Sequence, residues 1–182
     1  MFGENVAEHI RINAYRAIVE SVLLYNCGTW ALPVTVADRL DRAQRKMIRR
    51  VIGVKWYDKV SNTDLYTRCG LCPASEVVIH SRWRLFGHTL RLSEKTPARE
   101  AMSYYFQRDQ IGRQGNFVTI ATTLSREYKL ITSQSINTQD EYNSVVLAAQ
   151  DRDAWKQLAR KITNKCKELQ KAKALSRSEK ST

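Results

Sequence analysis

The sequence predicts an all-α fold, with a helical bundle, a smaller helical C-terminal segment and a basic tail. Apolar residues recur at spacings of three and four along most of the 182 residues, which is the period of helices with one buried face. Seven glycines and three prolines leave room for long helices. A hydrophobic content of 43% is sufficient for a packed core.

The first two predicted helices cover residues 4–25 and 36–52. Six residues share one face of the first: Val6, Ile10, Ala14, Ala17, Ser21 and Leu24. Thr35 is the expected N-cap of the second, and Gly53 ends it because glycine readily adopts a positive φ. The predicted buried face of this second helix consists of Leu40, Ala43, Met47 and Val51.

Two more helices follow before the next proline. Asn62 is a candidate cap for a short helix over residues 63–69, and Ser75 for a longer helix that continues to about residue 92. The buried stripe of the longer helix consists of Ile79, Trp83, Phe86 and Leu90. Gly87 predicts the close approach of another helix, because glycine otherwise costs about 1 kcal/mol relative to alanine. His88 is expected to be an interior, hydrogen-bonded histidine.

The chain is predicted to divide into four parts. These are a helical domain over 1–106, whose last helix starts at Pro97; a polar linker over 107–116; a helical segment over 117–170; and a disordered basic tail over 171–182. Within the third part, a polar loop over 132–139 precedes a last helical run over 140–170. The tail has too little apolar content to become ordered.

The basic charge predicts an anionic partner, with nucleic acid favoured over a membrane surface. The net charge is +12, and residues 39–59 hold eight basic side chains against two acidic ones. The predicted nucleic-acid contacts are Arg39, Arg42, Arg45, Lys46, Arg49, Arg50, Lys55, Tyr57, Arg82, Arg84 and Arg91. Trp56 is expected to pack in the core, which leaves Tyr57 as the surface aromatic. A solvated basic helix without a ligand is the alternative for residues 36–52 taken alone.

No catalytic site and no cofactor are predicted. The chain contains no adjacent pair of aspartates, no glycine-rich phosphate loop and no H-E-x-x-H or G-x-S-x-G motif. Asp151 and Asp153 lie two residues apart, so on a helix they would point about 200° apart. One of them is therefore expected to cap a helix.

A zinc-stabilised domain is the least favoured alternative, and no metal site is predicted. Its candidate ligands are Cys69 and Cys72, in a C-x-x-C motif, with His80 and His88. The two histidines lie about two helical turns apart, which is too far for both rings to reach one metal. The two cysteines are therefore expected to be semi-buried thiols at a turn.

The protein is expected to be intracellular, in the nucleus or the cytoplasm. No charged segment followed by a continuous apolar core marks an export signal. No stretch approaches the roughly 18 apolar residues that span a bilayer, so no membrane partner is expected. Four sparse cysteines are then most simply reduced thiols.

Five motifs follow one another along the chain. They are LLYNCGTWAL (23–32), ADRLDRAQRKMIRRVIGVKWYDKVSN (37–62), LYTRCGL (65–71), RWRLFGHTLRLS (82–93) and AAQDRDAWKQLA (148–159). This order resembles the C-terminal part of non-LTR (LINE-type) retrotransposon reverse transcriptases, closely over residues 12–106 and loosely over 117–160. In that family the segments follow the polymerase palm as a helical thumb and post-thumb region.

The resemblance implies a thumb-like domain that contacts a template–primer hybrid or target DNA through its backbone. The matching basic positions are Arg39, Arg45, Lys46, Arg49, Arg50, Lys55, Arg82 and Arg91, and the matching structural positions are Trp30, Trp56, Gly87 and His88. The palm, fingers and endonuclease of such a protein have no counterpart here. The resemblance therefore implies a fragment without its own catalytic site, with the palm of the parent polypeptide as a further partner. The alternative is a host-retained helical interaction module derived from a retrotransposon.

Overall fold

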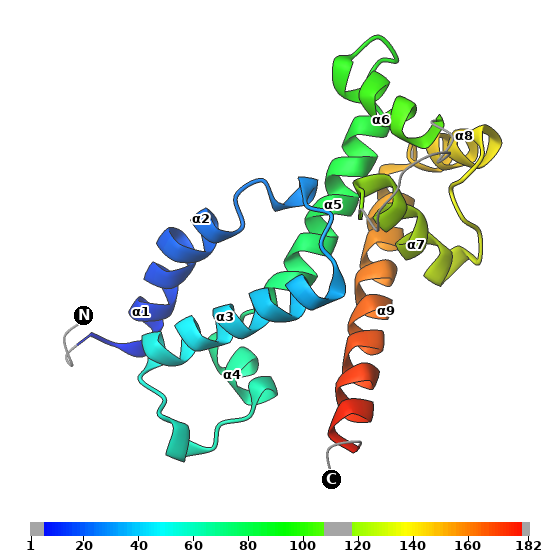
Figure 1. The fold of residues 1–182 in the computed structure, drawn as a ribbon. Helices are drawn as coiled ribbons and strands as arrows, with labels where there is room; N and C mark the ends of the chain where they lie inside the picture. The colour runs from blue at the N-terminus through cyan, green and yellow to red at the C-terminus, as the bar shows by residue number, and fades with distance from the viewer. Residues whose placement is uncertain (1–5, 108–117, 180–182) are drawn as a thin grey trace. The chain divides into compact units, whose positions relative to one another are not determined.

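The chain is helical throughout the part that the structure describes. The computed structural model describes residues 6–107 and 118–179, and the chain forms no strand there, which confirms the all-α prediction. The helices are α1 (Glu8–Ala14), α2 (Ser21–Leu23), α3 (Val34–Ile52), α4 (Asn62–Cys69), α5 (Ala74–Leu90), α6 (Pro97–Gln107), α7 (Ile120–Thr132), α8 (Gln139–Ala148) and α9 (Arg152–Glu179) (Figure 1). A π-helical stretch, Tyr15–Glu20, joins α1 to α2.

The chain divides into two compact units. Unit 1 comprises residues 1–27 and 33–78, and unit 2 comprises residues 28–32 and 79–182. The division falls inside α5, whereas the sequence predicts a boundary at the linker over 107–116, of which residues 108–116 lie outside the described residues. The reason is that Ile79, Trp83 and the apolar residues that follow them on α5 belong to the core of unit 2.

Unit 1 has a small apolar core formed by α1, the π-helical stretch, α3 and α4. Its buried members are Ile12, Tyr15, Ile48, Ile52, Leu65 and Cys69. The buried face predicted for residues 4–25 is therefore wrong, because Ile12 and Tyr15 face the core while Ile10 is half exposed. The π-helical turn is wider than an α-helical turn, so the positions that follow Tyr15, such as Ala17 and Ser21, depart from the 3.6-residue period as well.

The buried face of α3 carries polar side chains. It consists of Ala37, Asp41, Gln44, Ile48 and Ile52. The predicted face is wrong, because Ala43 is exposed and Leu40, Met47 and Val51 are only partly buried. Apolar periodicity treats Asp41 and Gln44 as solvent-facing, although both are buried here by the hydrogen bonds that they make.

Gln44 lies fully buried, with every hydrogen-bonding position of its amide occupied. Its Nε2 donates to Glu20 Oε1 and to the Cys72 carbonyl, both at 3.1 Å. Its Oε1 accepts from the Tyr66 hydroxyl at 3.0 Å and from the Ala74 backbone N–H at 2.8 Å. This one side chain therefore connects α3 to the π-helical stretch, α4 and the start of α5.

Asp41, one turn before Gln44 on α3, caps the N-terminal end of α5. Its Oδ1 accepts from the Ser75 backbone N–H at 2.8 Å, and its Oδ2 from the Ser75 hydroxyl at 2.7 Å. A carboxylate at this position also interacts favourably with the helix dipole. Ser75 was predicted to be the cap itself; the cap is instead supplied by α3, and α5 begins at Ala74, two residues before the start that a Ser75 cap implies.

Several helix ends agree with the sequence. Gly53 and Gly70 end α3 and α4 with φ of 77° and 59°, as predicted for Gly53. The Ser61 hydroxyl, rather than Asn62, caps α4 by accepting from the Asp64 N–H at 3.1 Å. Asp151 Oδ1 accepts from the backbone N–H groups of Asp153 and Ala154, both at 3.0 Å, which confirms that one aspartate of the pair is a helix cap.

The C-terminal helical run differs from its prediction in two ways. A turn at residues 149–151 divides it into α8 and α9, where the sequence predicted one run over 140–170. In addition, α9 continues to Glu179, although disorder was expected from residue 171. The segment ELQKAKAL is rich in residues with high helix propensity, so it extends a helix that has already started.

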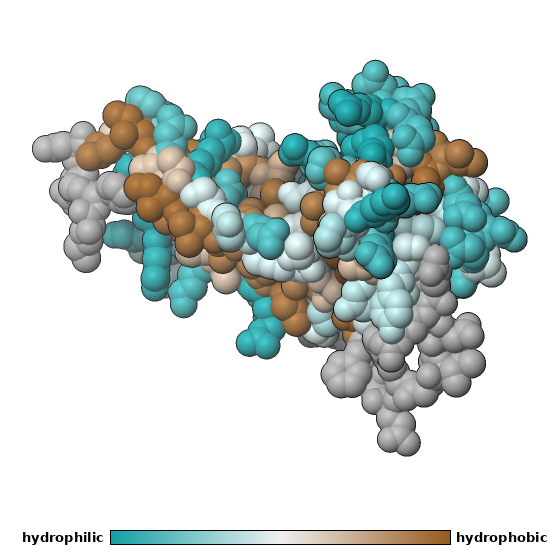
Figure 2. Space-filling view, turned by 90° about the horizontal axis from the view of Figure 1, so that it is seen from above, coloured by the Kyte–Doolittle hydropathy of each residue, from teal (hydrophilic) through white to brown (hydrophobic). Residues whose placement is uncertain are grey.

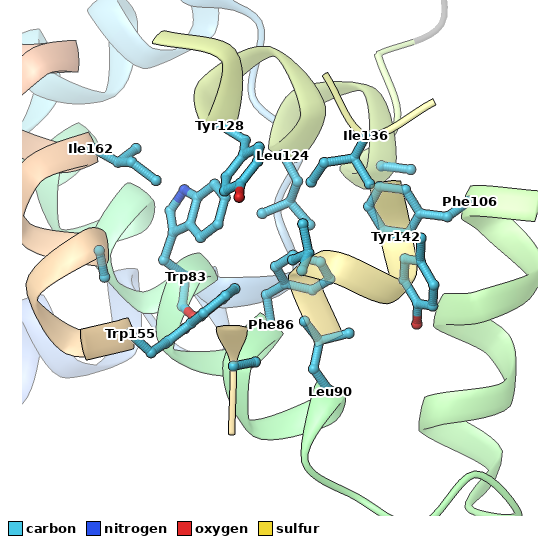
Figure 3. Packing of buried hydrophobic residues seen from close by; sticks show 14 of the residues in the cluster. Trp83, Phe86, Leu90, Phe106, Leu124, Tyr128, Ile136, Tyr142, Trp155 and Ile162 are labelled. Atoms are coloured by element: carbon cyan, nitrogen blue, oxygen red, sulfur yellow. The ribbon is translucent and has the colours of Figure 1, made fainter. Parts of the chain in front are cut away.

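Unit 2 has a larger, aromatic core, built on the predicted stripe of α5 (Figure 3). Trp83, Phe86 and Leu90 are at most 1% exposed and pack against residues of α6 to α9. Trp155 Nε1 donates to the Trp83 carbonyl at 2.9 Å, and a Cβ added to Gly87 would lie 2.1 Å from that nitrogen. The predicted close approach at Gly87 is confirmed. His88 is exposed, so its predicted interior position is wrong.

Replacing Gln44 by leucine should destabilise the chain by about 2–4 kcal/mol, because four polar groups, the buried Ala74 N–H and three partly buried ones, would lose a partner at once. Chemical denaturation followed by circular dichroism measures this loss. Ala43→Leu, at the neighbouring exposed position, is the control and should change the free energy of unfolding by less than about 0.5 kcal/mol. Equal stability of the two variants would contradict the role given to Gln44.

Replacing Gly87 by alanine should lower stability by about 1–3 kcal/mol, because the new methyl group overlaps the Trp155 indole. The sign is diagnostic, since the same change on an exposed helix stabilises by about 1 kcal/mol. The denaturation midpoint gives the measurement, and His88→Ala at the next, exposed position provides the comparison. A raised midpoint for Gly87→Ala would show that the indole does not pack on this glycine.

Candidate nucleic-acid interface

Four cations form an exposed row along α3, which we call the basic face. Arg39, Arg42, Lys46 and Arg50 are all exposed and follow one another at spacings of three, four and four. They therefore lie on the side of the helix opposite the buried Asp41 and Gln44. Among the described residues, none of the four forms an ion pair with a carboxylate. Their charges are thus available to an external anion.

Arg45 and Arg49, predicted to belong with this row, flank it and make contacts inside unit 1. Arg49 Nη2 donates to the Val60 carbonyl at 3.2 Å and to Asn62 Oδ1 at 2.9 Å. Burial raises the pKa of the Tyr66 hydroxyl to about 12, and a hydrogen bond from Arg45 opposes that effect. Arg49 therefore holds the segment before α4 in place, and both arginines are only partly exposed.

The segment 54–59 between α3 and α4, which we call the aromatic loop, presents two rings to solvent. Trp56 is 90% exposed and Tyr57 55% exposed, so the prediction that Trp56 packs in the core is wrong. The two rings meet edge to face, with centroids 5.8 Å apart. Lys55 Nζ lies 5.7 Å from the centroid of the Tyr57 ring. The only ring contact of Trp56 among the described residues is with the exposed Tyr57, so the indole is not packed into the core of unit 1.

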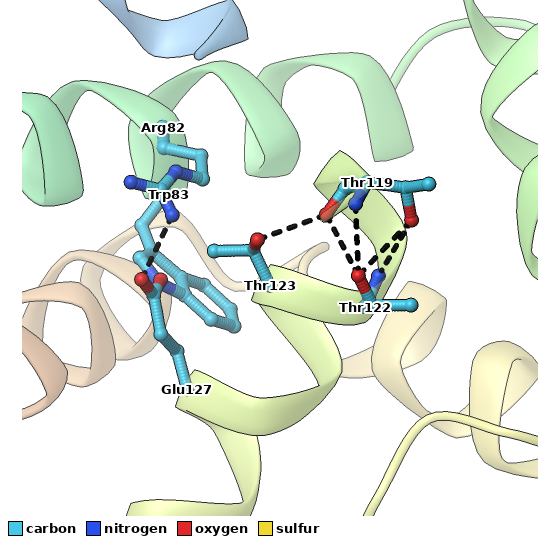
Figure 4. Close-up of polar contacts among 6 residues, drawn as sticks. All are labelled: Arg82, Trp83, Thr119, Thr122, Thr123 and Glu127. Atoms are coloured by element: carbon cyan, nitrogen blue, oxygen red, sulfur yellow. Dashed lines mark hydrogen bonds and ion pairs between the residues drawn. The ribbon is translucent and has the colours of Figure 1, made fainter. Parts of the chain in front are cut away.

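Arg82 is not a surface residue, although it was predicted to contact nucleic acid. It is 2% exposed, and its Nη1 lies 2.8 Å from Glu127 Oε1 (Figure 4). The other oxygen of Glu127 accepts from the Trp83 indole at 2.8 Å. Burial lowers the pKa of Arg82 and raises that of Glu127, so desolvation opposes the charge on each partner of this pair. The pair orders α5 against α7 in unit 2.

Arg91 is also engaged internally, which corrects its predicted role. Its Nη1 donates to the Ala149 carbonyl at 2.9 Å, at the C-terminal end of α8. A cation at this end of a helix satisfies a free carbonyl and interacts favourably with the helix dipole. Burial, followed by repulsion from Arg152, lowers the pKa of Arg91.

A second group of cations lies on unit 2 and includes a residue that the sequence analysis did not single out. Arg84 on α5 is exposed, as an anion-binding role requires, and His80 lies one turn earlier on the same helix. Burial, followed by repulsion from Arg84 and Arg160, lowers the pKa of His80. Arg160 of α9 thus lies near His80. The signal in the sequence that could have identified Arg160 is the charge of residues 151–182, which contain ten basic and four acidic side chains.

The candidate zinc ligands do not converge. Cys69 is buried and Cys72 exposed, while His80 is half-buried and His88 exposed. Within residues 6–107 and 118–179, no three histidine, cysteine or acidic side chains are placed to hold a metal ion. The zinc-stabilised alternative therefore has no ligand set in the described part of the chain.

None of the described helices combines the length and the apolar character that crossing a membrane requires.

Comparison of the chain with models of protein families, with curated proteins and with solved structures finds no match.

The cysteines should differ widely in reactivity toward iodoacetamide at about pH 8. Burial raises the pKa of the Cys166 thiol to about 12, so only about one molecule in ten thousand carries the thiolate there. We expect Cys72, which is exposed, to be alkylated at least about 100-fold faster than Cys166. Mass spectrometry of timed digests measures the rates, and concentrated guanidinium chloride should make them alike. Similar rates in the folded chain would contradict the described burial.

Proposed function

We propose that this chain binds nucleic acid through the phosphate backbone, as the non-catalytic thumb-like part of a LINE-type reverse transcriptase. The observation that carries the proposal is the basic face of α3, four exposed cations on one side of one helix without carboxylate partners among the described residues. The order of the five sequence motifs adds to it. The ligand class is a template–primer hybrid or target DNA.

The dimensions of the basic face suit a nucleic-acid strand. From Arg39 to Arg50 the helix rises about 16 Å, at about 1.5 Å per residue. DNA presents one phosphate per about 3.4 Å of axis on each strand, so several phosphates lie within reach of this row. Arginine offers a planar fork of donors that matches phosphate oxygens, and three of the four residues are arginines. Contacts of this kind position a backbone and do not read sequence.

A protein-binding helical module, retained by a host, is the second candidate function. Apolar side chains of α1, α2 and the segments adjoining them reach solvent at the left of Figure 2. Ile18, Val22 and Tyr25 are 65%, 74% and 80% exposed. Exposed apolar groups gathered in this way mark surfaces that bind other proteins. In the proposed parent enzyme the same surface would contact the polymerase palm.

A salt titration tests the nucleic-acid proposal. We expect the affinity for an RNA–DNA hybrid to fall as salt rises, with a log–log slope of about −0.9 for each phosphate contact. The double variant Arg42→Gln, Lys46→Gln should make this slope less steep by about 2 and weaken binding to all sequences alike. Fluorescence anisotropy with a labelled hybrid measures both quantities.

The matched control removes the same net charge elsewhere. Lys95→Gln with Lys129→Gln neutralises two exposed lysines of unit 2 and should leave the slope within about 0.5 of the unmodified chain. Equal effects of the two double variants would show that only total charge matters. Absence of binding at about 50 mM salt would refute the proposal.

A further inference from the structure

We infer that the aromatic loop is a stacking site for an unpaired base, so that the nucleic acid bound by this chain is single-stranded or carries a single-stranded end. The inference rests on the proposed function and adds a class of ligand to it. Its first observation is the exposure of Trp56 and Tyr57, at 90% and 55%. A large aromatic surface in water offers a base the apolar, π-rich face on which bases stack.

The backbone of the loop is held in its turn without a ligand. The Lys55 backbone N–H donates to Asp58 Oδ2 at 2.7 Å, which closes the tight turn that carries both aromatics. Beyond the turn, Arg49 holds the Val60 carbonyl and Asn62, so the loop is anchored to α3 on its far side as well. Little ordering of the backbone then remains to oppose binding, which favours a stacking platform over a disordered tip.

The charges around the rings match a nucleic-acid strand. Lys55 and Lys59 lie within the loop, and Arg50 of the basic face is six residues before Trp56. Lys55 Nζ, 5.7 Å from the Tyr57 ring centroid, can reach a phosphate while the ring contacts its base. An alternation of cations and exposed rings is the arrangement with which proteins hold single strands.

A membrane surface fits the loop less well. Helices and loops that insert into lipid headgroups present a broad apolar face. Trp56 instead stands among Lys55, Tyr57, Asp58 and Lys59, and insertion of the indole would take the Asp58 carboxylate toward anionic lipid. Binding to vesicles is therefore the competing outcome that the experiment has to distinguish.

The experiment compares two ligands and three variants of the full chain. The ligands are an oligothymidylate of about 12 nucleotides and a blunt DNA duplex of the same length. Trp56→Leu removes the indole, and Trp56→Phe keeps an aromatic face. The control is Tyr25→Leu, which removes an exposed aromatic side chain outside the aromatic loop, on the segment after α2. Since Trp56 and Tyr25 are exposed, all three variants should keep the unfolding midpoint of the parent chain.

We expect Trp56→Leu to weaken binding of the single strand about 5- to 150-fold and to leave duplex binding within about twofold. Trp56→Phe should retain most of the affinity, and Tyr25→Leu should match the unmodified chain. Binding of the single strand should also quench the tryptophan fluorescence of the unmodified chain more than that of Trp56→Leu.

The failures are distinguishable. If Trp56→Leu binds the single strand as tightly as the unmodified chain, while both show a steep salt dependence, the stacking inference is overturned and the proposed function stands. Vesicles of phosphatidylserine and phosphatidylcholine are tested with the same variants, and a loss of binding confined to these vesicles would overturn the inference in favour of a membrane surface. If neither oligonucleotide binds at about 50 mM salt, the proposed function and the inference fail together.

Discussion

Two side chains of α3 supply partners for the first backbone N–H groups of α5, which a helix cannot satisfy by itself. Gln44 and Asp41 accept from Ala74 and Ser75 at 2.8 Å, and both side chains are buried. An unpaired amide in their place would cost about 1–3 kcal/mol. The rotation of α3 about its axis is thereby set by polar contacts as much as by apolar packing. Because the polar side faces inward, the cations on the opposite side face water.

The sequence predicts well those parts of the fold that depend on local or strictly periodic signals. The all-α class follows from helical spacing, and Trp83, Phe86 and Leu90 are buried as their spacing requires. The end of α3 at Gly53 was predictable because it depends only on the positive φ of the glycine itself. The inward face of α3 was missed, since Asp41 and Gln44 are buried by partners far away in the chain. The π-helical turn after α1 likewise alters the period that the prediction assumes.

The candidate interface was predictable as a segment, though not residue by residue. The charge of residues 39–59 identifies α3 as basic. It does not distinguish the solvent-facing cations from Arg49, which donates a hydrogen bond to the Val60 carbonyl. On α5, Arg82 and Arg84 are two residues apart, yet one pairs with Glu127 in the core and the other is exposed. Glu127 is 45 residues further along the chain, so no local pattern shows that pairing. Trp56 is 90% exposed, and no local pattern in the sequence distinguishes it from a buried tryptophan.

The central claim is that the outward side of α3 and the loop after it form one binding surface. Nuclear magnetic resonance of the isotopically labelled chain, titrated with a short single strand, tests it most directly. The account predicts the largest shifts at the backbone amides of Arg39, Arg42, Lys46 and Arg50 and at the Trp56 indole. The indole N–H resonances of Trp83 and Trp155, which are hydrogen-bonded in the core, should not shift. If the largest chemical-shift changes fall on α7 or α8 and the Trp56 indole resonance does not shift, the claim is contradicted.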